Sequence, residues 1–159
     1  MPDKEVFETV DWNYETVAKR LRELAYLNKG VRINFIDERE RFTYEEEVDD
    51  NGNAVTLKIK QPAPEPATFK YDGGITDFVK HMSEDKTALY AQPLYYSAIK
   101  DVQIKGAPAG KIKVEFAFCH TKDDNESLYS FVNNISTVEG GYHETGFHNG
   151  LLKVINDYS

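Results

Sequence analysis

Apolar residues recur at two spacings along the chain, and the alternation between them predicts an α+β fold. A helical spacing runs from Tyr14 to about Asn28, from Ile75 to Met82 and from about Tyr142 to Tyr158. Asn13 is expected to cap the first of these helices. Alternating apolar and polar positions predict strands at residues 31–36, 42–48, 55–59, 68–71, 94–104, 112–118 and 127–133.

Residues 41–67 are predicted to form a surface excursion between two of these strands. Asp50-Asn51-Gly52-Asn53 contains residues that tolerate positive φ, which predicts a hairpin turn between strands 42–48 and 55–59. Gln61–Ala67 carries three prolines at alternate positions, which is typical of a stiff, polyproline-like connector. The acidic run Glu45–Asp50 lacks the ligand spacing of an EF-hand calcium loop.

The stretch from Phe131 to Tyr158 is predicted to be the end of a strand, a tight loop and a long helix. We expect that helix to pack across a sheet made by residues 112–118 and 127–133. Adjacent glycines permit backbone angles or close approaches that a Cβ would forbid. Such a loop at a helix N-terminus could bind an anion, or it could be a plain strand-to-helix corner. The candidate site residues of this loop are Asn133, Asn134, Glu139, Gly140, Gly141 and His143.

Composition and charge exclude several classes of function. With 159 residues the chain is one domain, or two small pieces that share a core. A net charge of −8 argues against a non-specific nucleic-acid binder, which needs a basic face. The single cysteine, Cys119, excludes an internal disulfide and a cysteine-rich zinc site. No apolar run approaches the roughly 20 residues that span a membrane, and the N-terminal residues do not resemble a signal peptide. We therefore expect a cytoplasmic protein.

The titratable residues near the loop do not form a recognisable catalytic motif. His143 and His148 are five positions apart, which turns their rings about 140° from each other on a helix and argues against a zinc-protease motif. Glu139 and Glu144 could act as a carboxylate pair, but the spacing does not fix their distance. Glu139 is better explained as a residue that favours the start of the helix. No catalytic, cofactor-binding or metal-binding residue is assigned.

Three blocks of the sequence resemble the B subunit of bacterial type II DNA topoisomerases, that is DNA gyrase or topoisomerase IV. The blocks are Tyr14–Val31, Phe69–Ile75 with Phe78-Val79 after it, and the run Asn-Asn-Ile-x-Thr-x-Glu-Gly-Gly-x-His-Glu-x-Gly-Phe that begins at Asn133. They occur in the order of the family and span nearly the whole chain. Tyr142 departs from the pattern, because the family usually has a threonine at this position.

The resemblance implies a fragment of a larger protein. Residues 1–86 would be the end of a gyrase-type (Bergerat) ATPase domain, and residues 87–159 the first sheet and helix of a ribosomal-protein-like transducer domain. The segment would couple ATP binding and dimer-gate closure to DNA strand passage. The parent enzyme would use ATP and Mg²⁺, form a homodimer, and work with the A subunit on DNA. The family's nucleotide-binding and DNA-cleaving residues lie outside this chain, so we expect it to have no ATPase activity alone.

Two other functions compete with this interpretation. The chain could be a self-contained, non-enzymatic protein-binding module, which predicts a stable monomer without a large apolar patch. A fragment should instead expose apolar surface and tend to self-associate. An enzyme that uses Glu139, His143 and Glu144 is the third alternative, although their spacing does not indicate a convergent site.

Overall fold

The computed structural model describes residues 5–6, 12–48, 54–103, 106, 108–123 and 125–159. The chain divides into two compact units, Met1–Phe78 and Val79–Ser159. Both units combine helices with antiparallel strands, so the predicted α+β class is confirmed. The predicted turn at residues 50–53 lies outside the described residues.

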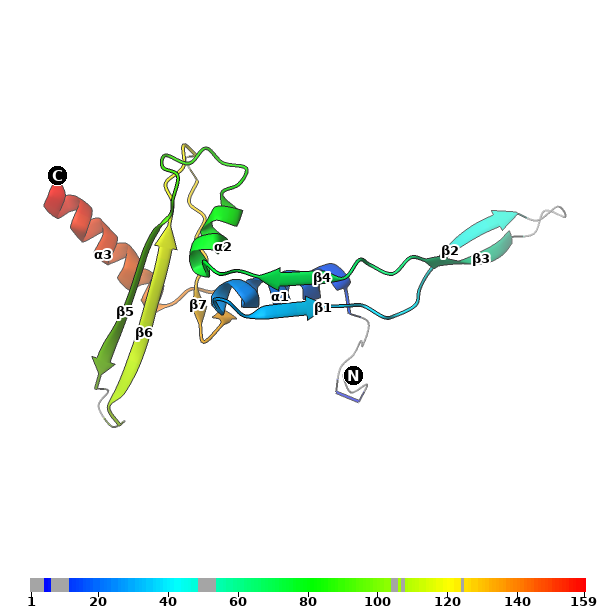
Figure 1. The fold of residues 1–159 in the computed structure, drawn as a ribbon, viewed down its shortest axis with the longest axis horizontal. Helices are drawn as coiled ribbons and strands as arrows, with labels where there is room; N and C mark the ends of the chain where they lie inside the picture. Colours follow the sequence, from blue (N-terminus) through cyan, green and yellow to red (C-terminus); the bar gives the residue numbers. More distant parts are fainter. Residues whose placement is uncertain (1–4, 7–11, 49–53, 104–105, 107, 124) are drawn as a thin grey trace. The chain divides into compact units, whose positions relative to one another are not determined.

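The core of the first unit is a helix packed on a two-stranded antiparallel sheet (Figure 1). Helix α1 (Tyr14–Leu27) begins where the Asn13 side chain accepts a hydrogen bond from the backbone N–H of Thr16 at 3.0 Å, which confirms the predicted cap. Strands β1 (Arg32–Phe35) and β4 (Ala67–Lys70) pair antiparallel. The core cluster consists of Ala18, Ala25 and Phe69, with Tyr14, Leu21, Ile33, Phe35, Ala67 and Tyr71 packed against it.

An aromatic stack continues this core towards helix α2 (Ile75–Met82). The ring of Tyr26 is stacked on Tyr71 with 3.6 Å between centroids, and the Phe78 ring lies 5.2 Å from it. Gly74, at φ +62°, lets the backbone before α2 lie close to Lys29, because a Cβ on residue 74 would be only 3.3 Å from Lys29 Cβ. The chain therefore turns at residues 72–74 and enters α2 directly.

The excursion between β1 and β4 contains a long hairpin. Strands β2 (Arg41–Val48) and β3 (Ala54–Gln61) pair antiparallel along their whole length, with Arg41 opposite Gln61 and Val48 opposite Ala54. The predicted hairpin is confirmed, and residues 62–66 are neither helix nor strand. Because the chain leaves β1, forms this hairpin and returns as β4, the two strands of the core sheet are neighbours without being consecutive (Figure 1).

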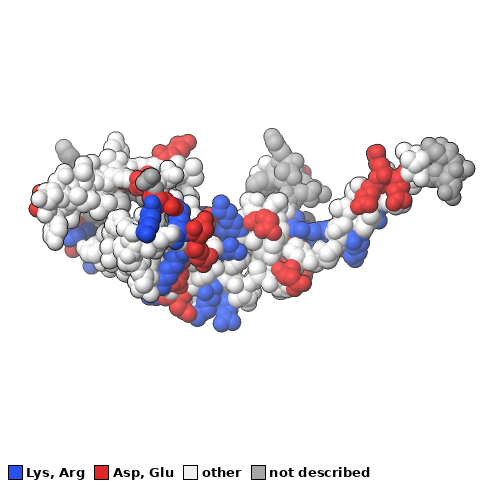
Figure 2. All heavy atoms as spheres, turned by 90° about the horizontal axis from the view of Figure 1, so that it is seen from above, with Lys and Arg blue, Asp and Glu red and all other residues white. Residues whose placement is uncertain are grey.

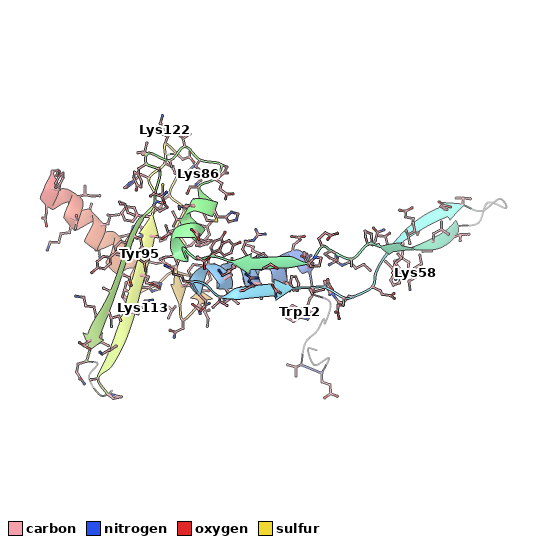
Figure 3. All side chains as sticks on the ribbon, viewed as in Figure 1. Trp12, Lys58, Lys86, Tyr95, Lys113 and Lys122 are labelled. Carbon is pink, nitrogen blue, oxygen red and sulfur yellow. The ribbon has the colours of Figure 1, made fainter. Side chains whose placement is uncertain are left out.

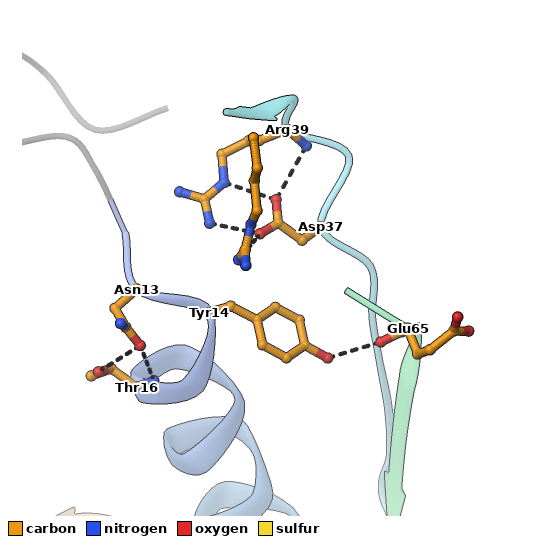
Figure 4. Close-up of polar contacts among 7 residues, drawn as sticks. Asn13, Tyr14, Thr16, Asp37, Arg39 and Glu65 are labelled. Carbon is orange, nitrogen blue, oxygen red and sulfur yellow. Dashed lines mark hydrogen bonds and ion pairs between the residues drawn. The ribbon is translucent and has the colours of Figure 1, made fainter. Parts of the chain in front are cut away.

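An ion cluster holds the root of this hairpin (Figure 4). The buried carboxylate of Asp37 accepts hydrogen bonds from Arg39 Nε at 2.8 Å, from Arg39 Nη2 at 2.7 Å and from Arg41 Nη2 at 3.0 Å. Arg41 also lies over the Tyr14 ring, 5.6 Å from its centroid, and the Tyr14 hydroxyl donates to the carbonyl of Glu65 at 2.9 Å. Both ends of the excursion are thus tied to the start of α1.

The same cluster predicts how acid affects the first unit. Hydrogen bonds from the Arg39 guanidinium hold the pKa of Asp37 well below its usual range. At pH values between the folded-state and the unfolded-state pKa of Asp37, the unfolded chain binds more protons than the folded chain. The stability that the cluster contributes is therefore fully present above the unfolded-state pKa of about 3.9 and falls as the pH drops below it. We expect the melting temperature of the wild type to fall more steeply from pH 5 to pH 2 than that of Asp37→Asn. Circular dichroism melts of both proteins test this, and equal slopes would contradict it.

The second unit contains a two-stranded sheet whose pairing differs from the prediction. Strand β6 (Gly110–Phe118) pairs antiparallel with β5 (Leu94–Val102), with Leu94 opposite Phe118. The predicted strand at residues 127–133, paired with 112–118, is wrong. Of these residues only Phe131–Val132 (β7) form a strand, and they pair with Ile135–Ser136 (β8). The chain reverses at Asn133 and Asn134, both at positive φ, so β7 forms a local hairpin with β8.

Helix α3 (Tyr142–Tyr158) begins where predicted and contacts the apolar face of β5–β6. The Phe147 ring lies 5.3 Å from the ring of Phe116, which is itself 5.2 Å from Tyr96 across the sheet. The alternation along residues 112–118 indicates one buried face, but the apolar side chains of that face are at most half-buried, at Phe116 and Phe118. Ile112 and Val114 remain 48% and 45% exposed.

The opposite face of β5–β6 carries a polar group made by Tyr95, Lys113 and Glu115, of which Figure 3 labels the first two. The Tyr95 hydroxyl donates to Glu115 Oε1 at 2.7 Å, and Lys113 Nζ lies 2.9 Å from the same oxygen. The hydrogen bond to Glu115 raises the pKa of Lys113. This face therefore combines a hydrogen-bonded polar group with the exposed Ile99, which lies opposite Lys113. Among the described helices, none combines the length and the apolarity needed to cross a membrane.

Candidate functional site

The candidate loop begins with a two-residue hairpin turn. Asn133 and Asn134 have φ values of 50° and 65°, and they connect β7 to β8. Positive φ at both central residues is the signature of a type I′ turn, in which asparagine is favoured because its short polar side chain tolerates this conformation. The two asparagines therefore explain the sharp reversal of the chain without any ligand.

A second turn carries the chain into α3. The backbone N–H of Gly140 donates to the carbonyl of Thr137 at 2.9 Å, and Gly140 has φ +77°. The carbonyl of Gly141 then accepts the first helical hydrogen bonds, from Glu144 at 3.1 Å and Thr145 at 3.2 Å. Gly141 offers no side chain to cap the helix. The loop therefore enters the helix through backbone contacts, and the polar side chains nearby serve another purpose.

Four side chains form what we call the hydroxyl–carboxylate cluster: Ser130, Thr137, His143 and Glu144. The Ser130 hydroxyl donates to Glu144 Oε1 and shares a hydrogen bond with the Thr137 hydroxyl. Thr137 Oγ1 lies 3.5 Å from the same carboxylate oxygen and 3.2 Å from His143 Nε2. Because the backbone N–H of Thr137 also donates to the Ser130 carbonyl at 3.0 Å, the cluster joins the β7–β8 hairpin to the first turn of α3.

Counting protons in the cluster shows what it can do. Each hydroxyl has one proton to donate, and the ionised carboxylate can only accept. One consistent chain of donors runs from His143 Nε2–H to Thr137, from Thr137 to Ser130, and from Ser130 to Glu144. In this chain the imidazole donates to the threonine and does not remove its proton, so the threonine is not activated as a nucleophile. The arrangement acts as a structural tie.

The glycine pair makes room for this tie. A Cβ on Gly140 would lie 3.1 Å from Glu144 Oε2, and a Cβ on Gly141 would lie 2.8 Å from the His143 ring. Glycine at both positions therefore lets the two side chains fold back over the loop. The Glu144 carboxylate lies against Gly140 at the helix N-terminus, which is where an external anion would be expected. The geometry favours the plain corner over an anion site.

The six predicted site residues fall into three places. Gly140, Gly141 and His143 lie together at the start of α3. Asn133 and Asn134 lie at the tip of the β7–β8 hairpin. Glu139 is exposed in the turn that precedes Gly140. Three of the six residues, Gly140, Gly141 and His143, therefore lie beside the cluster or in it. The other three lie outside the cluster.

The two histidines of this segment have different partners. His143 faces Thr137 and Glu144, and its Nε2 is 3.9 Å from Glu144 Oε1. His148 Nε2 instead lies 3.8 Å from Glu126 Oε1. Within the described part of the chain, no group of three or more His, Cys, Asp or Glu side chains could hold a metal ion.

Sequence reasoning missed the roles of Ser130 and Thr137. Both precede the glycine pair, and neither belongs to a motif with a fixed spacing to the helix. Glu144 was recoverable, because it is the third residue of α3 and acidic residues at this position commonly satisfy groups at a helix start. A carboxylate in the first turn of a helix, with hydroxyl residues shortly before it in the sequence, is the pattern that could have predicted the cluster.

Comparison with known proteins gives one consistent family. The family model described as DNA gyrase B matches residues 74–159. The chain is 35% identical over 158 residues to the DNA gyrase B protein of Clostridium acetobutylicum, and the match covers 99% of this chain and 20% of the relative. It is 40% identical over 159 residues to the DNA gyrase B protein of Halalkalibacterium halodurans, with coverage of 99% and 20%. The chain thus spans about a fifth of the length of these curated relatives.

Solved structures show the same likeness. The 43K ATPase domain of Thermus thermophilus gyrase B, in complex with an aminocoumarin, matches with a TM-score of 0.64 and 26% identity, covering 99% of this chain and 34% of that one. The B-subunit of the DNA gyrase from Myxococcus xanthus matches with a TM-score of 0.62 and 23% identity, covering 93% and 33%, which bears on the fold alone.

Proposed function

Because the chain belongs to the DNA gyrase B family, we propose that it is a segment of the gyrase B protein of an ATP-dependent type II DNA topoisomerase and couples ATP binding and dimer-gate closure to DNA strand passage. In this proposal residues 1–86 are the end of the ATPase domain, and residues 87–159 are the beginning of the transducer domain. The likeness to an ATPase-domain structure over 99% of the chain supports it.

The observation that carries the proposal is the uncovered apolar surface of the second unit. None of its described hydrophobic side chains is buried, whereas the first unit buries Ala18, Ala25, Tyr26 and Phe69. Val154, Ile155 and Tyr158 on α3 are 65%, 55% and 95% exposed. Apolar surface of this kind is characteristic of a site that packs against other protein. It supports a segment of a larger assembly and argues against the alternative, a self-contained binding module.

The cofactors and partners in this proposal belong to the parent enzyme. ATP and Mg²⁺ would be held elsewhere in the parent protein, and its partners would be the gyrase A protein, DNA and a second copy of the gyrase B protein. The loop before α3 does not fit a nucleotide, because the Glu144 carboxylate lies at the N-terminus of the helix, where a phosphate would have to bind. The role of this chain is mechanical, and the hydroxyl–carboxylate cluster is the element that ties a hairpin to the long helix.

A chimaera tests this function. The segment of the Halalkalibacterium halodurans gyrase B protein that aligns with this chain is replaced by it, and the product is assembled with the gyrase A protein. We expect the chimaera to hydrolyse ATP and to pass DNA strands, and the isolated 159-residue chain to hydrolyse none. Hydrolysis by the pure chain would contradict the proposal. A chimaera that hydrolyses ATP at the recipient's rate but passes no DNA would contradict the coupling role.

Sizing and dye binding of the isolated chain separate the two candidate functions. A fragment with an uncovered apolar face should bind a hydrophobic dye and self-associate, whereas a self-contained module should remain monomeric with little dye binding.

A further inference from the structure

One face of the β2–β3 hairpin carries a row of acidic residues beside a row of apolar residues. The strand register places Glu45 opposite Leu57 and Glu47 opposite Val55. Because side chains alternate between the two faces of a strand, these four residues share one face, and Ile59 extends the apolar row. The Cβ atoms of directly opposed residues in two paired strands are about 4.5–5.5 Å apart, so the two rows are neighbours. We call this surface the acid–apolar face.

The other face of the hairpin carries two lysines, Lys58 and Lys60, beside its one described glutamate, and its apolar side chains Tyr44 and Val48 are 65% and 71% exposed. The Lys58 ammonium, labelled in Figure 3, lies 3.9 Å from the centroid of the Phe42 ring. Lys60 pairs with Glu40 at 2.7 Å.

The acid–apolar face differs in its charge: no described cation pairs with Glu45 or Glu47, and its apolar row is part-exposed, with Leu57 at 37%. Nearer the root on this side of the hairpin, Gln61 Nε2 donates a hydrogen bond to Thr43 Oγ1 at 2.7 Å.

The hairpin has a fixed root and, among the described elements, no extensive packing partner along its length. Among the described elements, β2 and β3 pair extensively only with each other. Isolated two-stranded hairpins are at best marginally stable in water, so this one would gain stability from a partner that covers the acid–apolar face. The Asp37 cluster at the root fixes where the hairpin leaves the core, which pre-organises the face for binding.

We propose that the acid–apolar face binds a cationic amphipathic segment of another protein, with a row of apolar residues beside a row of Lys or Arg. In Figure 2 acidic side chains gather over the outer part of the hairpin, with basic ones nearer its root. This charge repels nucleic-acid phosphates and anionic lipids. A second copy of the hairpin would bring the same carboxylates together or bury them on apolar surface, which is costly. A basic amphipathic segment would pair its cations with the carboxylates and cover the apolar row with its own apolar side chains.

A labelled peptide tests the proposal with the full 159-residue chain. The probe is a fluorescein-labelled helical peptide of Leu and Lys, with the leucines in one stripe, and binding is followed by fluorescence anisotropy. The double variant Glu45→Gln/Glu47→Gln should weaken binding about fivefold, since each exposed ion pair contributes modestly. Leu57→Thr should weaken it about tenfold, because an apolar contact is lost while the strand is retained.

Glu46→Gln is the matched control, because Glu46 lies opposite Thr56 on the other face and the substitution removes the same charge. It should change the affinity less than about twofold. An equal loss with Glu46→Gln and with the double variant would show attraction by overall charge and overturn the proposal. So would equally tight binding of a peptide in which every Lys is replaced by Glu, or a dimer of the chain alone that Leu57→Thr dissociates. The outcome does not depend on the proposed coupling role.

Discussion

Replacing Phe69 with alanine should lower the free energy of unfolding of the first unit by about 3–5 kcal/mol. Phe69 is 5% exposed and packs with Ala18 and Ala25 of α1. The facing helix positions are alanines, which cannot extend into the space that the ring leaves, so the cavity would stay largely open. The Arg22 guanidinium, 5.4 Å from the ring centroid, would also lose its contact. Small domains have only about 5–15 kcal/mol of stability in total, so urea titrations followed by circular dichroism should show a clear shift.

Phe42→Ala is the matched control for this prediction. Phe42 lies on β2, outside the core, and its ring contacts the Lys58 ammonium. Losing that cation–π contact should cost about 0.5–1 kcal/mol. Equal destabilisation by the two variants would mean that the core of the first unit is not where the structure places it.

The elements that could be predicted from sequence are those with local signals. Asn13 caps α1 because its side chain reaches an N–H three residues away, a distance fixed by helix geometry. The β2–β3 hairpin followed from alternation and from turn residues between the strands. In each case the residues that determine the structure are close together in the sequence.

The partner of β6 was not predicted, because alternation indicates a strand without identifying the strand beside it, and β6 pairs with the preceding strand β5. Alternation at residues 127–133 is equally compatible with a strand beside β6 and with a short local hairpin. The positive φ of Asn133 and Asn134 reverses the chain and explains why β7 pairs with β8. Alternation predicts that a strand has an apolar face, but it does not show whether another element covers that face. On β6 the apolar side chains of Ile112 and Val114 remain exposed.

The contacts of the candidate loop could not be predicted from the sequence. The glycine pair indicated close approach, and the structure identifies the approaching groups as the side chains of His143 and Glu144. Ser130 and Thr137 enter the cluster only because β7 and β8 fold the chain back, so no spacing in the sequence reports them. Residue types indicated where the loop is, and tertiary contacts determined what it does.

Glu144→Ala should accelerate hydrogen exchange at the backbone amides of Thr137 and Gly140 by about 10- to 100-fold. A hydrogen bond to a charged group contributes about 1.5–3 kcal/mol, and about 1.4 kcal/mol corresponds to a tenfold change in local opening. The carboxylate accepts from the Ser130 hydroxyl and lies near that of Thr137, so its removal releases the tie between hairpin and helix. Both amides are hydrogen-bonded within the loop, which makes them direct reporters of its opening. Exchange followed by NMR resolves them individually.

Glu139→Ala is the control, because it removes the same charge from an exposed position in the same loop and should leave both amides unchanged. If the two variants accelerate exchange equally, net charge and not the cluster holds the loop together. The comparison extends to the proposed function. A tie that fixes the start of α3 should be needed for coupling but not for chemistry, so a chimaera carrying Glu144→Ala should keep its ATP hydrolysis and lose strand passage. Retention of both activities would show that the tie serves the fold alone.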